Sequence, residues 1–149
     1  MNLKFMDLAF EEAIKAFEEG EVPIGCVIVC GNRVIAAAHN MKERMQCATK
    51  HAEILAVEKA SEIFCNWRLD NCDVYITLEP CPMCASALKQ ARVRHIFCGL
   101  SNSDANNFKI ISEILKKDKN NSGVSITNDL VVEKVKILMK KFFENRRNS

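Results

Sequence analysis

The chain has 149 residues, of which 48% are apolar and 27% are charged, and its net charge at pH 7 is +2. This length matches one domain, and this composition is typical of a globular protein rather than a disordered chain. No stretch approaches the ~20 apolar residues of a membrane-spanning helix, and the first residues lack the basic-then-apolar order of a secretory signal. We therefore expect a single domain over residues 1–149, located in the cytoplasm and not in a membrane.

The small net charge conceals an uneven distribution of charge along the chain. Residues 1–30 hold two bases and six acids, whereas residues 133–147 hold six bases and two acids. A basic end on a nearly neutral chain indicates either a polyanionic partner or a solvated helix face, and charge alone does not decide between the two.

The N-terminal part of the chain predicts a helix followed by a hairpin. Apolar residues at steps of three and four predict an amphipathic helix over residues 3–19, with Gly20 as its C-cap. The apolar, β-branched run at 24–30 predicts a buried strand, and residues 33–39 predict a second strand. Gly31 and Asn32 between them are typical of a tight turn.

The rest of the chain alternates helices with strands. Further helices are predicted over residues 51–63, 82–90, from the end of the polar loop 101–107 to about 117, and 130–145, and further strands over 73–78, 94–98 and 124–127. Polar stretches at 40–50 and 118–123 predict loops. Strands joined by helical crossovers pair in parallel. We therefore expect an α/β fold, a three-layer α/β/α sandwich with a mixed five-stranded sheet.

Eight cysteines require an account, because disulfides are not expected in a reducing compartment. Only Cys81 and Cys84 have the C-x-x-C spacing. Three others lie in apolar strands and are interpreted as core residues: Cys26, Cys30 and Cys98. The sequence context of the last three indicates no role: Cys47, Cys65 and Cys72.

Two short motifs carry chemistry, and each opens a predicted helix. His51 and Glu53 begin one helix, and Cys81 and Cys84 lie three apart in the first turn of another. A helix N-terminus and a bound cation both favour thiolate over thiol. One imidazole nitrogen and two thiolates occupy three of the four tetrahedral positions of zinc, and a catalytic zinc keeps the fourth for water. Glu53 can then act as a proton carrier rather than as a ligand.

Other interpretations of the same residues remain open at this point. A C-x-x-C pair can be a redox dithiol, although such a pair normally stands alone after a thioredoxin-like strand. A non-catalytic, zinc-stabilised interaction module would need a fourth protein ligand. The candidates for that ligand are His39, Cys47, His95 and Cys98.

Taken together, the motifs form the H-x-E…P-C-x-x-C signature established for the zinc-dependent nucleobase deaminases. Over nearly its whole length the chain resembles the bacterial tRNA-specific adenosine deaminases, which have the cytidine deaminase-like fold. The resemblance is carried by Glu21-Val22-Pro23-Ile24-Gly25, Asn40, His51-Ala52-Glu53-Ile54, Thr77-Leu78-Glu79-Pro80-Cys81-Pro82-Met83-Cys84-Ala85, Phe142-Phe143 and Arg146-Arg147.

The resemblance implies a complete metal centre and a reaction. His51, Cys81 and Cys84 hold one zinc ion per subunit, and zinc lowers the pKa of its bound water toward ~7. Glu53 takes a proton from this water, whose oxygen attacks C6 of adenine. Glu53 then delivers protons to the ring nitrogen and to the leaving ammonia, and the product is inosine.

The resemblance also implies the substrate contacts and the assembly. The partner is a tRNA anticodon stem-loop, gripped by a homodimer. The implied substrate-binding residues are Asn40, Pro23, Ile24, Ala52 and Pro80 around the nucleotide, and Phe143, Arg146 and Arg147 on the last helix. Because Phe142 and Phe143 point about 100° apart on a helix, we expect one to pack inward and the other to face a loop base. We expect Arg146 and Arg147 to lie off the face that docks this helix onto the core, so that replacing both leaves the docking face unchanged.

Two loops depart from the family pattern, and one alternative substrate class stays open. Residues 47–50 and 101–107 differ from the runs that contact RNA in the family, so the mode of tRNA recognition is not carried over. Pro-Cys-Pro-Met-Cys also resembles bacterial guanine deaminases. The alternative function is therefore deamination of a free base or nucleoside such as guanine or cytidine. The basic end of the chain favours RNA.

Overall fold

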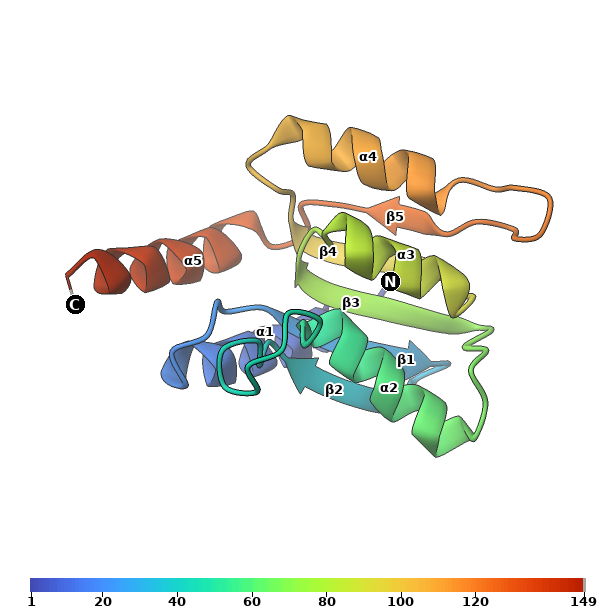
Figure 1. Cartoon of the computed structure of the whole chain (residues 1–149), viewed down its shortest axis with the longest axis horizontal. Coiled ribbons are helices and arrows are strands. Elements are labelled where there is room, and N and C mark those ends of the chain that lie inside the picture. The colour runs from blue at the N-terminus through green and yellow to red at the C-terminus, as the bar shows by residue number, and fades with distance from the viewer. Residues whose placement is uncertain (149) are drawn as a thin grey trace.

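The computed structural model describes residues 1–148, which form one five-stranded sheet with helices on both faces (Figure 1). The helices are α1 (Leu3–Glu18), α2 (Ala52–Phe64), α3 (Pro82–Gln90), α4 (Ala105–Leu115) and α5 (Val132–Arg147). The strands are β1 (Gly25–Cys30), β2 (Arg33–His39), β3 (Cys72–Leu78), β4 (His95–Leu100) and β5 (Ser125–Thr127). The expected number and order of elements are confirmed.

The sheet is mixed, with strand order β2-β1-β3-β4-β5. Strand β1 pairs antiparallel with both β2 and β3, and β4 and β5 continue the sheet in parallel. The antiparallel pair β1–β2 is closed by the tight turn at Gly31, whose φ is +64°. The parallel half arises because α3 and α4 each carry the chain back across the sheet.

Alternate residues of each strand build two separate cores. Cys26 and Ile28 of β1 face the core that α2, α3 and α4 cover, whereas Val27 and Val29 face the core that α1 covers. Figure 1 shows α2 and α3 in front of the sheet. At Gly25 a Cβ atom would lie 1.9 Å from the Ala9 carbonyl oxygen of α1, so the close approach of α1 to β1 requires glycine there. The three-layer α/β/α prediction is thereby confirmed.

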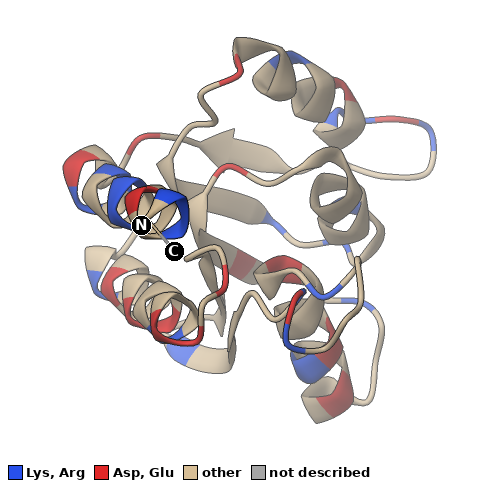
Figure 2. Ribbon diagram, turned by 60° about the vertical axis from the view of Figure 1, so that its left-hand side comes forward, with Lys and Arg blue, Asp and Glu red and all other residues tan. Residues whose placement is uncertain are grey.

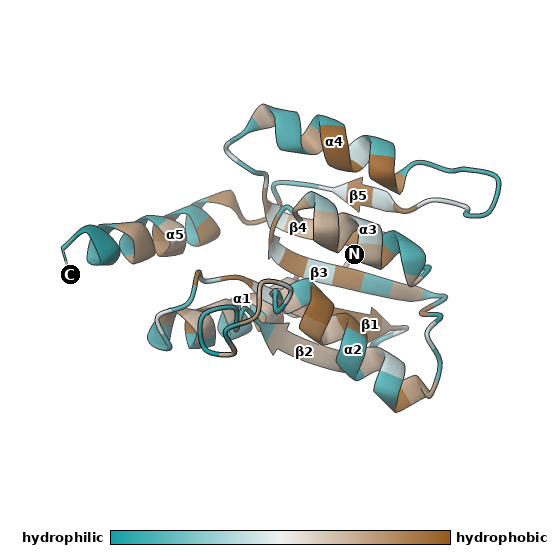
Figure 3. Ribbon diagram, in the orientation of Figure 1, coloured by the Kyte–Doolittle hydropathy of each residue, from teal (hydrophilic) through white to brown (hydrophobic). Residues whose placement is uncertain are grey.

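The C-terminal helix α5 packs against α1. Phe142 is 3% exposed, and its ring centroid lies 6.5 Å from that of Phe17. Val135 is also buried, beside Gly99 of β4. The last turn of α5 is hydrophilic (Figure 3). Among the described residues, no helix is long and apolar enough to cross a membrane.

Several predicted boundaries are wrong by a few residues, for local reasons. The expected loop 101–107 is shorter, because the Asp104 side chain accepts from the Asn106 N–H and starts α4 at Ala105. Helix α5 starts two residues late, because the N–H groups of Leu130 and Val131 donate to the carbonyls of β4. Strand β4 runs on to Leu100 rather than ending at residue 98.

Candidate active site

The two motifs meet because each starts a helix at the same edge of the sheet. His51 is the N-cap residue of α2, which follows β2 through the 41–50 loop. Cys81 is the N-cap residue of α3, and Pro82 occupies the first helical turn, where its fixed φ suits the helix. Cys84 lies one turn further and is completely buried. Strands β2 and β3 run in the same direction, since both are antiparallel to β1, so their C-terminal ends lie together.

The three predicted ligand side chains lie together. His51 Nδ1 is 3.7 Å from Cys81 Sγ and 3.5 Å from Cys84 Sγ. The three atoms all lie within 4.8 Å of one another, and no other such group of three occurs among residues 1–148. One nitrogen and two sulfurs are a donor set that suits zinc.

None of the candidates for a fourth protein ligand joins this group within the described chain. His39 instead contacts two acids of the α1 region, with its Nε2 3.0 Å from Glu19 Oε2. His95 contacts Thr127 Oγ1 at 2.8 Å in the opposite half of the sheet. A three-ligand group leaves a coordination position for water, as in a catalytic rather than a structural zinc site.

The protonation of the two thiols is strongly unequal. Hydrogen bonds from Cys84 and from His51 lower the pKa of Cys81 to about 4. The hydrogen bond with Cys81, together with burial, raises the pKa of Cys84 well above its usual range. Of the two thiols, Cys81 is therefore the one that ionises more readily. A divalent cation held by this group would favour the ionised form of both thiols.

Glu53 is a buried acid beside the thiols. Its side chain is 3% exposed, and its Oε1 atom has no hydrogen-bond partner in the described chain. Burial raises the pKa of the Glu53 carboxyl to about 7. An unpartnered carboxyl oxygen is costly to bury. Its position next to Cys84 therefore fits a group that meets a water or a substrate atom rather than one that supports the fold.

The 41–50 loop, which leads into His51, is fastened by two side chains. Asn40 is buried, its Nδ2 donates to the Val22 carbonyl at 3.3 Å, and its Oδ1 accepts from the Lys42 N–H. Glu21 is 1% exposed, and its carboxylate accepts from two backbone N–H groups of the loop, at Glu43 and Arg44. Glu21 belongs to a segment that carries the family resemblance, but its role was not predicted, because its partners are more than twenty residues away.

The side chains proposed to surround the nucleotide differ in exposure. Pro23, Ala52 and Pro80 are buried, and Ile24 is half-buried. A cavity of about 540 Å³ begins at Leu78, the last residue of β3, and lies between the start of the 101–107 loop and α5. It is lined by Leu78, Leu100, Ser101, Asn102, Ser103, Lys136, Met139 and Phe143.

The two phenylalanines near the end of α5 differ in burial, as expected. Phe142 is buried against α1, whereas Phe143 is 44% exposed and lines the cavity. The expectation for Arg146 is wrong, because its guanidinium lies 5.4 Å from the centroid of the Phe142 ring, on the docking face. Arg146 is four residues after Phe142, and this spacing places the two side chains on one helix face.

Four residues of α5 form a stripe that was not predicted. Lys136, Lys140, Phe143 and Arg147 follow one another at steps of four, three and four, so they share one face of the helix. Lys136 and Phe143 of this stripe line the cavity. No ion pair involves its three bases within residues 1–148. Figure 2 shows the basic residues of α5 beside the acidic α1.

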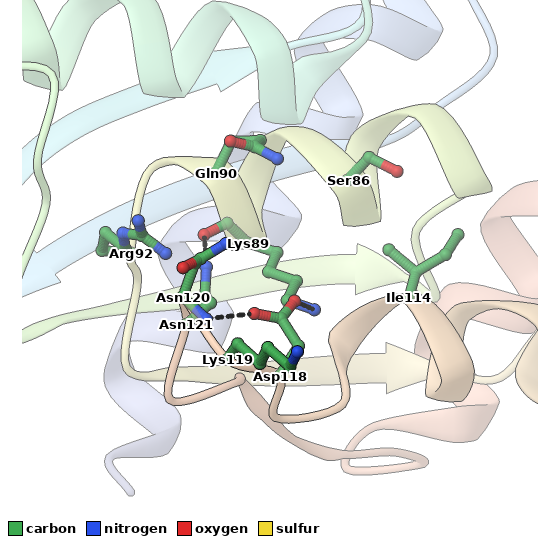
Figure 4. A pocket seen from close by; sticks show the side chains of 9 residues that line it. All are labelled: Ser86, Lys89, Gln90, Arg92, Ile114, Asp118, Lys119, Asn120 and Asn121. Atoms are coloured by element: carbon green, nitrogen blue, oxygen red, sulfur yellow. Dashed lines mark hydrogen bonds and ion pairs between the residues drawn. The ribbon is translucent and has the colours of Figure 1, made fainter.

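A second cavity of about 540 Å³ lies at the far end of α3, away from the cysteines (Figure 4). Lys89 there is held by its own chain, since its Nζ donates to Asp118 at 2.8 Å and to the Lys116 carbonyl at 2.7 Å. The Asn121 side chain donates to the Lys89 carbonyl. This cavity is therefore separate from the His-Cys-Cys group.

A mixed sheet that carries H-x-E and P-C-x-x-C at two adjacent helix starts defines a deaminase of the cytidine deaminase-like class. The sequence model of the MafB19-like deaminases matches residues 2–147. The chain is 35% identical over 143 residues to the tRNA-specific adenosine deaminase of Bacillus subtilis, covering 96% of this chain and 89% of that protein. It therefore belongs to the MafB19-like deaminases, and among them to the tRNA-specific adenosine deaminase family.

Solved structures agree with this placement. A structure from a study of A-to-I editing by tRNA:A34 deaminases at the wobble position of transfer RNA has a TM-score of 0.84 and 33% identity, covering 92% of this chain and 99% of that one. Guanine deaminase from Bacillus subtilis has a TM-score of 0.66 and 28% identity, covering 100% of this chain and 96% of that one. The chain is thus more similar in structure to the tRNA:A34 deaminase than to the guanine deaminase.

Proposed function

We propose that this protein deaminates adenosine to inosine at the wobble position of a tRNA anticodon, with one zinc ion per subunit. The observation that carries the proposal is the full-length likeness to tRNA:A34 deaminases in a chain whose His51, Cys81 and Cys84 lie together. The whole chain, residues 1–149, is taken as one deaminase domain. A tRNA substrate supports a location in the cytoplasm.

In the proposed mechanism, His51, Cys81 and Cys84 would hold the zinc ion, which would supply a Lewis acid when bound. Glu53 accepts a proton from the attacking water at its unpartnered Oε1 atom. The water oxygen bonds to C6 of adenine, the C6–N bond breaks, and Glu53 returns protons to the ring nitrogen and the departing ammonia. Adenosine and water thus give inosine and ammonia.

The RNA contacts are proposed to lie on the cavity side of the molecule. The three bases of the α5 stripe can meet phosphates, and the exposed ring of Phe143 can stack on a loop base. The target base lies in a single-stranded loop, so its extrusion costs little. Asn40 is proposed to hydrogen-bond the flipped nucleotide, and the pocket around the base is proposed to be lined by Pro23, Ile24, Ala52 and Pro80. Arg146 extends the basic surface beside Arg147 of the stripe.

The protein is also proposed to act as a homodimer, as its resemblance to the family implies. Neighbouring helices α3 and α4 each expose apolar side chains on the same layer of the molecule. Met83 is 36% exposed, Phe108 43% and Ile110 50%. These side chains support a contact face for a second copy on the α3–α4 layer.

A second candidate function is deamination of free guanine, which the likeness to the guanine deaminase from Bacillus subtilis favours. One assay separates the two. Purified protein is incubated with an anticodon stem-loop bearing adenosine at the wobble position, and separately with adenosine, guanine and cytidine, and ammonia release is measured. We expect release with the stem-loop only. Release with guanine and none with RNA would replace the proposal by the second candidate.

The stripe on α5 makes a testable contribution to RNA affinity. We expect Lys140→Ala with Arg147→Ala to weaken stem-loop binding and to lower the salt dependence of log affinity by about 1.5, because two phosphate contacts are lost. The melting temperature should not change, since both side chains are exposed. Binding is measured by fluorescence anisotropy at several salt concentrations.

The matched control removes the same charge elsewhere. Lys117→Ala with Lys119→Ala lies in the segment after α4, at the far edge of the sheet, and should leave affinity and salt slope near those of the parent. Equal effects of the two double variants would mean that net charge, and not the α5 stripe, attracts the RNA.

A further inference from the structure

Glu79 is a buried acid that neither the metal group nor the proton transfer uses. Its side chain is 3% exposed, and it follows directly after β3, two residues before Cys81. Its N–H donates to the Leu100 carbonyl at 2.8 Å, which extends the pairing of β3 with β4. The backbone that presents this carboxylate is therefore fixed.

The Glu79 carboxylate joins three segments of the chain. Its Oε2 accepts from Asn107 Nδ2 at 2.7 Å, in the first turn of α4. Its Oε1 accepts from Asn128 Nδ2 at 3.0 Å, directly after β5. Asn107 Nδ2 also donates to the Pro80 carbonyl at 3.1 Å. One amide thus ties the turn before Cys81 to the end of the 101–107 loop.

The other end of that loop is held in the same way. Asp129 accepts from the Ser101 N–H at 2.8 Å and from the Ser101 hydroxyl at 2.9 Å. The segment 101–107, which comprises this loop and the first turn of α4, is therefore anchored at Ser101 by Asp129 and at Asn107 by Glu79. Residues 101–103 between these anchors line the cavity beside α5.

We propose that Glu79 is a positioning residue that holds the turn before Cys81 and the segment 101–107 in a single relative placement. The proposal rests on the proposed function, because the substrate RNA would lie in the cavity that this segment lines. A bound base must meet Glu53 and the metal group in one geometry, and a misplacement of 1 Å can lower the rate by about 100-fold. Glu79 is the one side chain bonded to both amides that set this placement.

The network also predicts which substitution it tolerates. Asn128 Oδ1 is buried and has no partner in the described chain, so the Asn128 amide can turn over at little cost. Asn107 cannot, because its Nδ2 also donates to Pro80. In Glu79→Gln, the Gln oxygen can keep the Asn107 bond while its NH₂ group donates to the turned Asn128. In Glu79→Ala, both amides lose their acceptor.

The test compares these variants in zinc content, melting temperature, kcat and KM on the anticodon stem-loop. We expect Glu79→Gln to keep kcat within about threefold of the parent. Glu79→Ala should keep its zinc and lose about 100-fold in kcat/KM, mostly through kcat. Full activity in Glu79→Ala would overturn the proposal. Loss of zinc in proportion to activity would also overturn it, because Glu79 would then only support the metal site.

A compensating pair tests the donor–acceptor logic directly. Asn128→Asp places a second carboxylate against Glu79 and should lower kcat at least tenfold. The double variant Glu79→Gln with Asn128→Asp restores a donor opposite an acceptor and should recover to the level of Glu79→Gln. No recovery in the double variant would contradict the network.

Failure of the proposed function is visible separately. If the parent releases no ammonia from RNA, the deaminase proposal fails by that result alone. Hydrogen exchange of residues 101–107 then still tests Glu79. Exchange should speed up in Glu79→Ala and not in Glu79→Gln, and unchanged exchange in Glu79→Ala would overturn the positioning role.

Discussion

Replacing Glu53 with glutamine is expected to lower the deamination rate by about 10²- to 10⁴-fold. Glutamine has the same shape but cannot accept a proton from water and return it to the base. The fold should be retained or gain stability, because the neutral amide is less costly to bury than a carboxylate whose Oε1 has no partner. Ammonia release and thermal melting measure the two parts of this prediction, and zinc content checks that the metal group is intact.

The control for this variant lies on the same helix. Glu62 is exposed near the C-terminal end of α2, and Glu62→Gln makes the same chemical change away from the metal group. It should match the parent in every measurement. A Glu53→Gln protein that works at nearly the parent rate would show that another group moves the protons, and the mechanism proposed above would be wrong.

The elements of the fold could be predicted because each has a strong local signal. The alternation of β1, with Cys26 and Ile28 on one face and Val27 and Val29 on the other, follows from the strand repeat. The grouping of His51, Cys81 and Cys84 could be predicted because the H-x-E and P-C-x-x-C motifs are local and each opens a helix. These helices follow β2 and β3, which run in the same direction on either side of β1, so both helix starts lie at one edge of the sheet.

What the sequence did not predict depends on contacts between distant residues. Glu79 and Asn128 are 49 positions apart, and Glu21 and Arg44 are 23 apart, so no periodicity links them. The contact of Arg146 with Phe142 is different, because a spacing of four on one helix was visible in the sequence. The α5 stripe was visible in the same way, since its spacing of four, three and four is local.

These two kinds of residue have different consequences for function. The proposed ligands and Glu53 lie in local motifs, and they carry the proposed chemistry. Glu21, Asn107 and Glu79 are determined by long-range contacts, and they hold the loops 41–50 and 101–107 around that chemistry. The two loops are also where the sequence departs from the family pattern. We therefore expect this chain to share the reaction of its relatives and to differ from them in how the RNA loop is seated.

Replacing Cys84 with alanine is expected to reduce zinc from about one ion per chain to near zero. Cys84 is completely buried, and only two of the three grouped donors would remain. Because metal binding to the folded protein is coupled to its stability, the melting temperature should fall as well. Zinc is measured by mass spectrometry of the dialysed protein, and X-ray absorption of the parent should show one nitrogen and two sulfur ligands.

A chelator separates loss of the metal from damage to the fold. Adding it should lower the melting temperature of the parent and leave Cys84→Ala unchanged, because the variant has no zinc left to lose. Cys65→Ser is the matched control, since Cys65 is exposed and its contact with the Glu62 carbonyl is one that a serine hydroxyl can keep. It should hold one zinc ion and respond to the chelator as the parent does. Full zinc content in Cys84→Ala would remove that sulfur from the metal site, and with it the three-ligand arrangement on which the proposed reaction depends.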